Sequence, residues 1–306
     1  MIVIETNHLC KRYGKDRGII DVNLAVKQGE TFGFIGPNGA GKSTTIRTLL
    51  NFIFPTSGEA KINGLDCIKN SKKIRQIIGY LPSEVNYYDD MNAGQLFKYS
   101  SNFYKKDCTK RINELCEIFQ VDKSKKVGEM SLGNKKKVGI VQALLHEPEI
   151  LIFDEPTSGL DPLMQKMFFN VLKEQNKKGT TIFFSSHILS EVQEICSRVA
   201  IIKEGKILKT DEVSVLRNSQ FKKIMICLSE ENIIDISEIN IDGAVNIKIE
   251  QDKKNTITFL YTGKIDDLLY NLHKLKLSNL LIEEPSLEEI FMHYYEKEEV
   301  KNDELI

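Results

Sequence analysis

Short apolar runs and amphipathic segments follow one another through the first two thirds of the chain. Residues 31–35, 149–154 and 180–185 are mostly apolar runs of five or six residues, typical of strands buried on both faces. Apolar residues at helical spacing cover 42–52 and 164–176. Strands that alternate with helices predict an α/β domain with a mostly parallel sheet.

Two further segments complete this first domain, which we expect over residues 1–215. Residues 1–30 contain short apolar runs that end in a turn at 27–30, and this pattern predicts strands. Residues 88–146 have a helical pattern and predict a helical subdomain. Its expected buried face consists of Leu96, Phe97, Phe103, Ile112, Leu115, Ile118 and Phe119.

A small α+β accessory domain is expected over residues 216–306. Alternating patterns and turn residues predict strands and one helix in the order 223–228, 244–250, 256–261, 264–275 (the helix) and 277–284. Residues 251–255 are typical of a hairpin turn. Ser286 and Glu289 have the spacing of a capping box, which predicts a last helix. The acidic tail 296–306 is expected to fray.

The bulk composition narrows the class of protein. The 306 residues carry a net charge of −1 and are 41% hydrophobic and 28% charged, as in ordinary globular proteins. This balance argues against nucleic acid as a partner, which a strongly basic face would indicate. No apolar run approaches the ~18 residues of a membrane span, and the N-terminus lacks a signal-peptide pattern. The six cysteines form no CxxC pair and indicate reduced thiols in a cytoplasmic protein.

Residues 36–44 carry the most specific motif of the chain. They fit G-x-x-x-x-G-K-[ST], follow an expected strand and open an expected helix. In such a loop, backbone N–H groups and the helix N-terminus bind phosphate oxygens. We therefore expect Lys42 to bridge the β and γ phosphates of ATP and Ser43 to hold Mg²⁺. The expected nucleotide-binding residues of this loop are Gly36, Pro37, Asn38, Gly39, Ala40, Gly41, Lys42, Ser43 and Thr44.

An acidic pair follows one of the buried runs. Asp154 ends the apolar stretch 150–153, and Glu155 comes directly after it. Asp154 can steady Mg²⁺ directly or through water. Glu155 can polarise the water that attacks the γ-phosphate. A buried strand can end in two acidic residues by chance, but together with the phosphate loop the pair indicates a site for ATP hydrolysis.

These motifs together resemble the ABC ATPase family, and further segments match that family in order across residues 2–215. The resemblance implies a P-loop core with antiparallel β and helical subdomains. Tyr13 is similar to the aromatic residue that stacks on adenine, although alone it fits any core or surface aromatic. His187 is similar to the switch histidine that contacts the γ-phosphate. Residues 79–83 lie where the family has its glutamine loop, but Ser83 replaces the glutamine.

Two other segments resemble the parts of the family that act across a dimer. Ser131, Gly133 and Asn134 are similar to the signature that reaches ATP held by a second copy, and Ser131 also suits a helix N-cap. Leu132 stands where the signature usually has its first glycine. Residues 158–161, which end in Asp161, are similar to the D-loop, which crosses the dimer interface.

The resemblance implies an ATP hydrolase that dimerises on ATP binding, with a second copy or a related ATPase. It also implies an integral membrane permease as partner, which places the subunit on the inner face of the cell membrane. Residues 283–291 resemble the ending of drug-resistance-type exporter ATPases and favour export. A soluble ABC ATPase and a nucleotide-dependent regulator remain alternatives. The lysines at 135–137 are interpreted as a solvated helix face.

Overall fold

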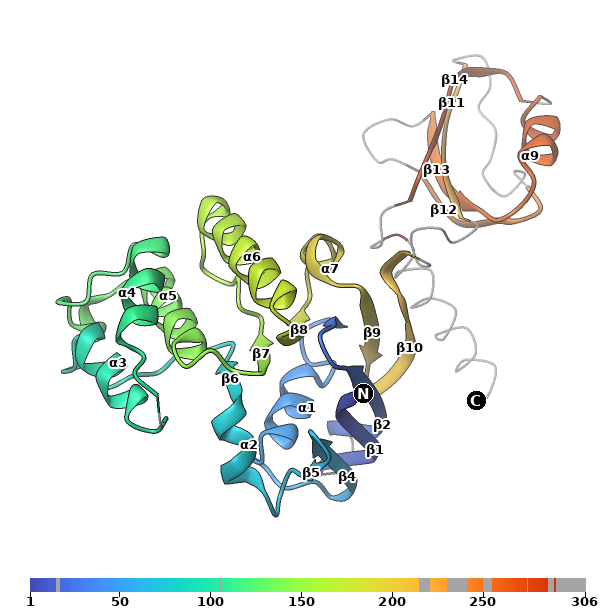
Figure 1. Cartoon of the computed structure of the whole chain (residues 1–306). Helices are drawn as coiled ribbons and strands as arrows, with labels where there is room; N and C mark the ends of the chain where they lie inside the picture. The colour runs from blue at the N-terminus through green and yellow to red at the C-terminus, as the bar shows by residue number, and fades with distance from the viewer. Residues whose placement is uncertain are drawn as a thin grey trace. The chain divides into compact units, whose positions relative to one another are not determined.

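In a computed structural model, the chain divides into two units, 1–211 and 212–306 (Figure 1). The structure describes residues 1–14, 17–104, 106–214, 221–229, 241–249, 255–273, 275–285 and 289. The division lies near the boundary at residue 215 that the sequence led us to expect. That the two parts have separate functions stays a prediction.

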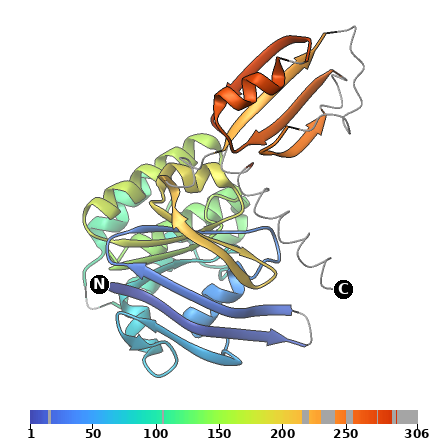
Figure 2. The ribbon, with the colours of Figure 1, turned by 90° about the vertical axis from the view of Figure 1, so that its right-hand side faces the viewer.

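The first unit begins with an antiparallel sheet in the order β2-β1-β4-β5. Its strands are β1 (Ile2–Tyr13), β2 (Arg17–Lys27), β4 (Ser57–Ile62) and β5 (Leu65–Asp66). Figure 2 shows β1 and β2 as long paired strands. Both are longer than the apolar runs of the sequence. The pairing of β1 with β2 shifts register between Thr6 and Leu9 and again before Lys11, which interrupts the two-residue period.

The second sheet is the parallel core of this unit, with its described strands in the order β10-β9-β3-β8-β7-β6. The strands are β3 (Thr31–Ile35), β6 (Ile78–Leu81), β7 (Ile150–Asp154), β8 (Thr181–Ser186), β9 (Arg198–Lys203) and β10 (Lys206–Glu212). β3 pairs in parallel with β8 and β9, β8 with β7, and β7 with β6. Every residue of β3, β7 and β8 is buried, as in strands covered on both faces. The expected α/β fold is confirmed.

Helices surround this parallel sheet, and α3, α4 and α5 lie together in Figure 1. The helices are α1 (Lys42–Leu49), α2 (Ser71–Ile77), α3 (Ala93–Ser101), α4 (Thr109–Ile118), the 3-10 turn η1 (Val127–Glu129), α5 (Leu132–Leu144), α6 (Pro162–Lys177) and α7 (Leu189–Ile195). Helix α1 ends before residue 52, the end we expected. Asn51 has a φ of 53°, the left-handed conformation that commonly terminates a helix.

The sequence pattern assigned one residue wrongly to the buried helical face. Leu96, Phe97, Leu115 and Phe119 are buried as predicted. The prediction for Phe103 is wrong, because its side chain is 63% exposed. Helix α3 has already ended at Ser101, so the helical spacing no longer directs this side chain inward.

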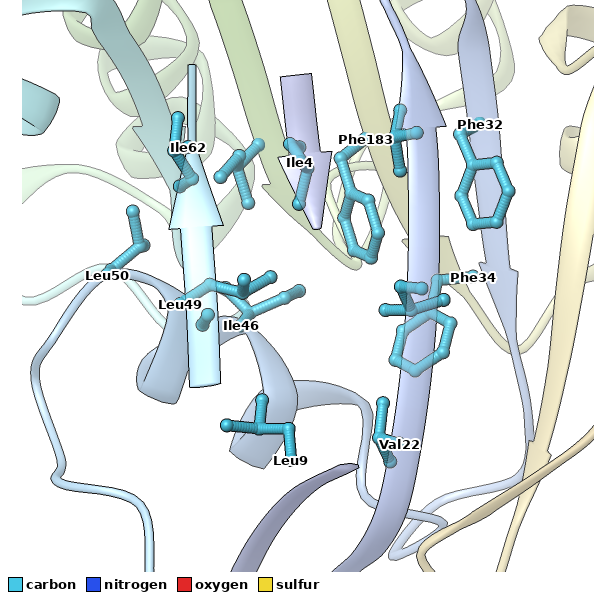
Figure 3. Close-up of a cluster of buried hydrophobic side chains, with 14 of the residues drawn as sticks. Ile4, Leu9, Val22, Phe32, Phe34, Ile46, Leu49, Leu50, Ile62 and Phe183 are labelled. Carbon is cyan, nitrogen blue, oxygen red and sulfur yellow. The ribbon is translucent and has the colours of Figure 1, made fainter. Parts of the chain in front are cut away.

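The hydrophobic core of the first unit lies around α1, where the two sheets meet (Figure 3). Ile46 and Leu49 of α1 belong to one buried cluster with residues of both sheets. The antiparallel sheet contributes Ile4 and Ile62, and the parallel sheet contributes Phe34 among others. Each such side chain contributes about 1.5–3 kcal/mol when fully buried. The core therefore fixes the start of α1, and with it the phosphate loop, against β3.

The second unit is a four-stranded antiparallel sheet with one described helix. Its order is β12-β13-β11-β14. The elements are β11 (Lys222–Leu228), β12 (Ala244–Ile249), β13 (Thr256–Tyr261), α9 (Ile265–Leu272) and β14 (Leu277–Glu283), all close to the predicted bounds. Leu268 and Leu272 of α9 pack with Ile224, Ile226 and Phe259 of the sheet. The expected hairpin turn, last helix and acidic tail lie largely or wholly outside the described residues.

Candidate functional site

Four loops meet at one edge of the parallel sheet. Because β3, β6, β7 and β8 are parallel, their carboxyl ends share this edge, where open α/β sheets bind ligands. A cavity of about 340 Å³ lies here. It is lined by Asn38, Gly39, Gly41, Lys42, Ser43, Thr44, Ser83, Glu84, Glu155 and Ser158.

The phosphate loop is shaped by two positions that require glycine. A Cβ at residue 36 would lie 2.3 Å from the backbone oxygen of Ile202. Gly41, the N-cap of α1, has a φ of 111°, which side-chain-bearing residues rarely adopt. The Lys42 ammonium is buried and donates to the backbone oxygens of Gly36 at 2.7 Å and Pro37 at 3.1 Å. The loop therefore surrounds the ammonium group of Lys42 at the start of α1.

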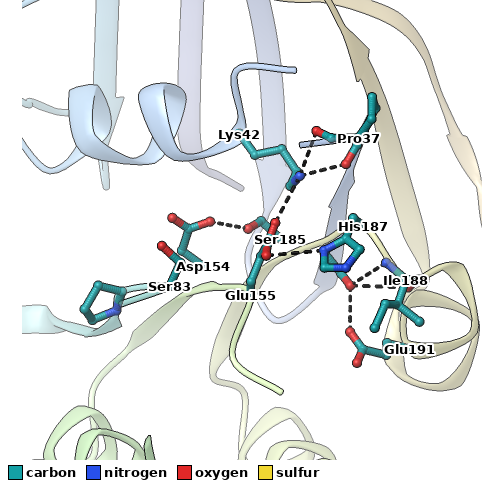
Figure 4. Close-up of polar contacts among 12 residues, drawn as sticks. Pro37, Lys42, Ser83, Asp154, Glu155, Ser185, His187, Ile188 and Glu191 are labelled. Atoms are coloured by element: carbon teal, nitrogen blue, oxygen red, sulfur yellow. Dashed lines mark hydrogen bonds and ion pairs between the residues drawn. The ribbon is translucent and has the colours of Figure 1, made fainter. Parts of the chain in front are cut away.

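Glu155 links two of the predicted site residues (Figure 4). Its Oε1 lies 3.2 Å from the Lys42 Nζ, and its Oε2 lies 3.2 Å from the His187 Nδ1. Burial alone would raise the pKa of Glu155, but hydrogen bonds and charge from Lys42 and His187 outweigh it and lower the pKa. The carboxylate is thus held ionised, the form that can accept a proton. Its φ of 47° is left-handed, a strained conformation that often marks a functional site.

Asp154, the residue before Glu155, has one carboxylate oxygen without a hydrogen-bond partner among the described residues. The side chain is buried, and its Oδ1 accepts a hydrogen bond from the Ser185 Oγ at 2.6 Å. Its Oδ2 is also buried and has no hydrogen-bond partner among the described residues. A buried carboxylate oxygen without a partner is costly unless a cation or water satisfies it. A carboxylate oxygen of this kind, together with a hydroxyl such as that of Ser43, is a donor set that fits Mg²⁺, which prefers hard oxygen ligands.

The predicted signature residues and Asp161 do not line this cavity, whereas Ser158, the first residue of the D-loop, does. Ser131 and Asp161 are the N-caps of α5 and α6, where they accept backbone hydrogen bonds from Asn134 and Met164. The N-cap interpretation of Ser131 is therefore confirmed.

The two segments touch each other within the chain. A Cβ at Gly133 would lie 2.6 Å from the backbone oxygen of Gly159, so this contact requires glycine at 133. The start of α5 therefore packs against the D-loop backbone instead of facing the cavity of its own chain.

Tyr13 lies apart from the cavity, near the end of β1. Its ring is 46% exposed, and the Lys11 ammonium lies 5.3 Å from the ring centroid. An exposed aromatic face of this kind can stack on a planar ligand, and its role stays a prediction.

The interpretation of the lysines at 135–137 as a solvated face is wrong for one of them. Lys136 is 1% exposed, and its Nζ donates to the backbone oxygens of Pro82 at 3.2 Å and Ser83 at 2.8 Å. The helical period offered a signal for this burial. Lys136 shares one face of α5 with the buried Ile140 and Ala143, four and seven positions further on.

Glu191 is a second residue that the motifs did not indicate. It is buried in α7 and accepts a hydrogen bond from the Ser186 Oγ at 2.6 Å (Figure 4). The same hydroxyl accepts from the backbone N–H of Ile188 at 2.9 Å. These bonds fix the turn that presents His187 to Glu155.

Comparison with known proteins places the chain in a family. A family model described as ABC transporter matches residues 19–158. The bacitracin transport ATP-binding protein BcrA of Bacillus licheniformis is 36% identical over 306 residues, which cover 95% of this chain and 96% of that protein. The chain belongs to the ABC transporter ATP-binding proteins. The linearmycin resistance ATP-binding protein LnrL of Bacillus subtilis is 30% identical and covers 95% of this chain and 97% of its own length.

A solved structure supports the ABC fold directly. The structure of an ATP-binding subunit of an ABC transporter has a TM-score of 0.67 and 30% identity, over 71% of this chain and 92% of that one. The resemblance inferred from the motifs is confirmed. As an ABC ATP-binding subunit, the chain binds and hydrolyses ATP to power transport through a membrane permease. Across the described residues, no helix is long and apolar enough to cross a membrane.

Proposed function

We propose that this ABC subunit binds Mg·ATP in the cavity at the carboxyl ends of β3, β7 and β8. A second copy completes the site with its own Ser131, Gly133 and Asn134. One observation carries this proposal: the cavity contains the phosphate loop and Glu155 but none of the signature residues of the same chain. A site that needs both halves has to receive the second half from another chain.

The residues that surround the cavity have distinct roles in this proposal. Lys42 neutralises charge on the β and γ phosphates, with backbone N–H groups of 36–44 around them. Ser43 and Asp154 hold Mg²⁺, which adds positive charge at the phosphates when bound. Glu155 orients the attacking water and accepts its proton, and His187 holds Glu155 from the other side. Asp161 lies at the dimer interface, and Tyr13 stacks on adenine.

The permease partner docks, we propose, in a second cavity of about 600 Å³ that is lined by residues of β6, α3 and α5 among others. Its lining includes the aromatic rings of Phe52, Tyr80, Tyr87, Tyr88, Tyr99 and Tyr104. Tyr88 and Phe52 are exposed. This aromatic groove, in which some of the rings are exposed, suits the apolar face of a short amphipathic helix. The cytoplasmic part of an integral membrane permease supplies such a helix and holds the subunit at the inner face of the membrane.

Export is the direction of transport that the relatives support. One relative that matches over 97% of its length is named for linearmycin resistance, and another is named for bacitracin transport. One name states resistance to a compound and the other states transport of one, and export of a toxic compound agrees with both. The residues at 283–291 that resemble exporter endings agree with this direction.

ATP binding and hydrolysis by the purified chain test the proposal. We expect Lys42→Ala to weaken ATP binding about 10- to 100-fold, because charge-assisted hydrogen bonds contribute about 1.5–3 kcal/mol each. Lys177→Ala, an exposed lysine of α6, is the matched control and should bind as the wild type does. Unchanged affinity in Lys42→Ala would refute the assignment of the phosphate loop. Tight ATP binding without hydrolysis in any condition would favour the nucleotide-dependent regulator.

A further inference from the structure

Lys136 is a buried cation that the ATPase site does not use directly. It lies on α5, five positions after Ser131, and is 1% exposed. Its Nζ donates to the backbone oxygens of Pro82 and Ser83, at 3.2 Å and 2.8 Å. No ion pair of this ammonium occurs within the described part of the chain. Its contacts therefore bind it to one segment of backbone.

That segment, residues 82–88, borders both cavities described above. Ser83 and Glu84 line the cavity that contains the phosphate loop. Pro82 and the residues from Val85 to Tyr88 line the aromatic groove. The two carbonyl groups that Lys136 binds lie where the chain passes from one cavity to the other. A displacement of the backbone here changes both linings at once.

Helix α5 contacts this segment a second time. A Cβ at Gly139 would lie 2.7 Å from the Tyr87 hydroxyl and 2.6 Å from a methyl group of Leu81. Lys136 and Gly139 are three positions apart and therefore neighbours on one face of the helix. The helix that begins with the signature residue Ser131 is thus fixed to the segment by a hydrogen-bonded contact and a close-packed one.

The charge of Lys136 distinguishes it from a residue that only fills space. Burying an ammonium group is costly unless hydrogen bonds compensate it. Burial lowers the pKa of Lys136 to about 8, against the opposing effect of the negative Asp154 and Glu155. An apolar side chain would fill the same volume without this desolvation cost. Compared with such an apolar side chain, the ammonium adds the two hydrogen bonds to the backbone oxygens of Pro82 and Ser83.

We propose that Lys136 is a positioning residue that fastens the 82–88 segment to α5. The fastening sets where Ser83 and Glu84 stand at the phosphate cavity. This inference rests on the proposed function for the meaning of the two cavities. The mechanical link itself rests only on the contacts of Lys136 and Gly139.

The test compares three variants of the full chain. Lys136→Met keeps the length of the side chain but removes the charge and the donors. Lys136→Gln keeps donors without the charge. Lys137→Met removes a neighbouring lysine that is only half-buried and serves as the matched control. Each variant is measured by hydrogen exchange of the backbone amides at 83–88 and by steady-state hydrolysis of Mg·ATP.

We expect Lys136→Met to accelerate exchange at 83–88 about fivefold or more, because the backbone loses its fastening. Its kcat should fall by a similar factor while KM changes less than about twofold, since the phosphate loop is untouched. Lys136→Gln should recover most of both losses, and Lys137→Met should match the wild type. If Lys136→Met does not fold, the exchange and the kcat of Lys136→Gln against Lys137→Met decide the question. The proposal then requires that the exchange at 83–88 and the kcat of Lys136→Gln stay near those of Lys137→Met.

Two results would overturn the inference. Exchange at 83–88 in Lys136→Met that equals the control means that the ammonium does not hold the segment. A loss of kcat in Lys136→Gln as large as in Lys136→Met means that the charge, and not the hydrogen bonds, matters. Failure of the wild type to hydrolyse ATP would count against the proposed function, while the exchange measurement would still test the link.

Discussion

His146 gives the first unit a defined loss of stability in acid. Its side chain is 6% exposed, its ring stacks on Tyr104 with centroids 3.8 Å apart, and its Nε2 lies 3.1 Å from the backbone oxygen of Ile78. The Nε2–H of the neutral ring can donate to that oxygen. Burial lowers the pKa of His146 to about 4, and the Ile78 carbonyl opposes the shift only in part.

The sign of the effect follows from where the proton binds. An unfolded histidine has a pKa of about 6.5. Between about pH 6.5 and pH 4, the unfolded chain binds a proton at this position that the folded chain does not, so the free energy of unfolding falls as the pH falls. Integrated to pH 4.5, this loss is about 2.5 kcal/mol, and above about pH 7 the group contributes no pH dependence.

Urea unfolding followed by circular dichroism at pH 7.5 and pH 4.5 measures this contribution. His146→Phe keeps an aromatic ring against Tyr104 but cannot titrate. It should be less stable by about 1 kcal/mol at pH 7.5, the scale of one lost hydrogen bond. Between the two pH values it should lose about 2.5 kcal/mol less than the wild type does. His273→Phe removes an exposed histidine and should behave as the wild type. Equal acid losses in the wild type and His146→Phe would refute the reasoning.

Two further predictions concern Ser83 and the second unit. Ser83→Ala should change basal hydrolysis by less than about 1 kcal/mol in barrier, roughly fivefold, because Lys136 contacts the backbone oxygen of this residue and not its hydroxyl. Its larger effect should appear in stimulation by the reconstituted permease, and steady-state rates with and without the permease check this. Inactivation of the isolated subunit would make Ser83 a catalytic group. Deleting residues 216–306 should leave ATP affinity within about threefold, because the phosphate loop, Asp154 and Glu155 all lie in the first unit. Equilibrium binding of labelled ATP checks it, and a folded truncated chain without affinity would contradict it.

The sequence predicted well the local structure of those candidate-site segments that follow directly from a buried strand. The phosphate loop after β3 and the acidic pair at the end of β7 are each fixed by a short segment whose residue types and order predict the local structure. The parallel register then brings these segments to one edge, which the alternation of strands and helices already implied. Local sequence was sufficient here because each motif contains its own structural context.

Contacts between distant segments were not predictable in the same way. Lys136 stands in a run of three lysines, and only its partners at 82–83, some 50 positions away, show that it is buried. Phe103 was assigned to a helical face because its spacing continued beyond the end of α3. Strand β1 was predicted too short because its register shifts break the alternation of polar and apolar residues. In each case a tertiary constraint decided the outcome.

The central claim is that two copies of this subunit share the ATP site, and Glu155→Gln tests it most directly. The amide keeps the shape of the side chain but cannot accept a proton as the carboxylate does, so hydrolysis should fall at least about 100-fold while ATP still binds. Size-exclusion chromatography with light scattering, in the presence of ATP and Mg²⁺, should give twice the 35.0 kDa mass of one chain. Without nucleotide, or with Lys42→Ala added, the same protein should give the mass of one chain. A Glu155→Gln subunit that stays monomeric with ATP and turns over at the wild-type rate would contradict the account.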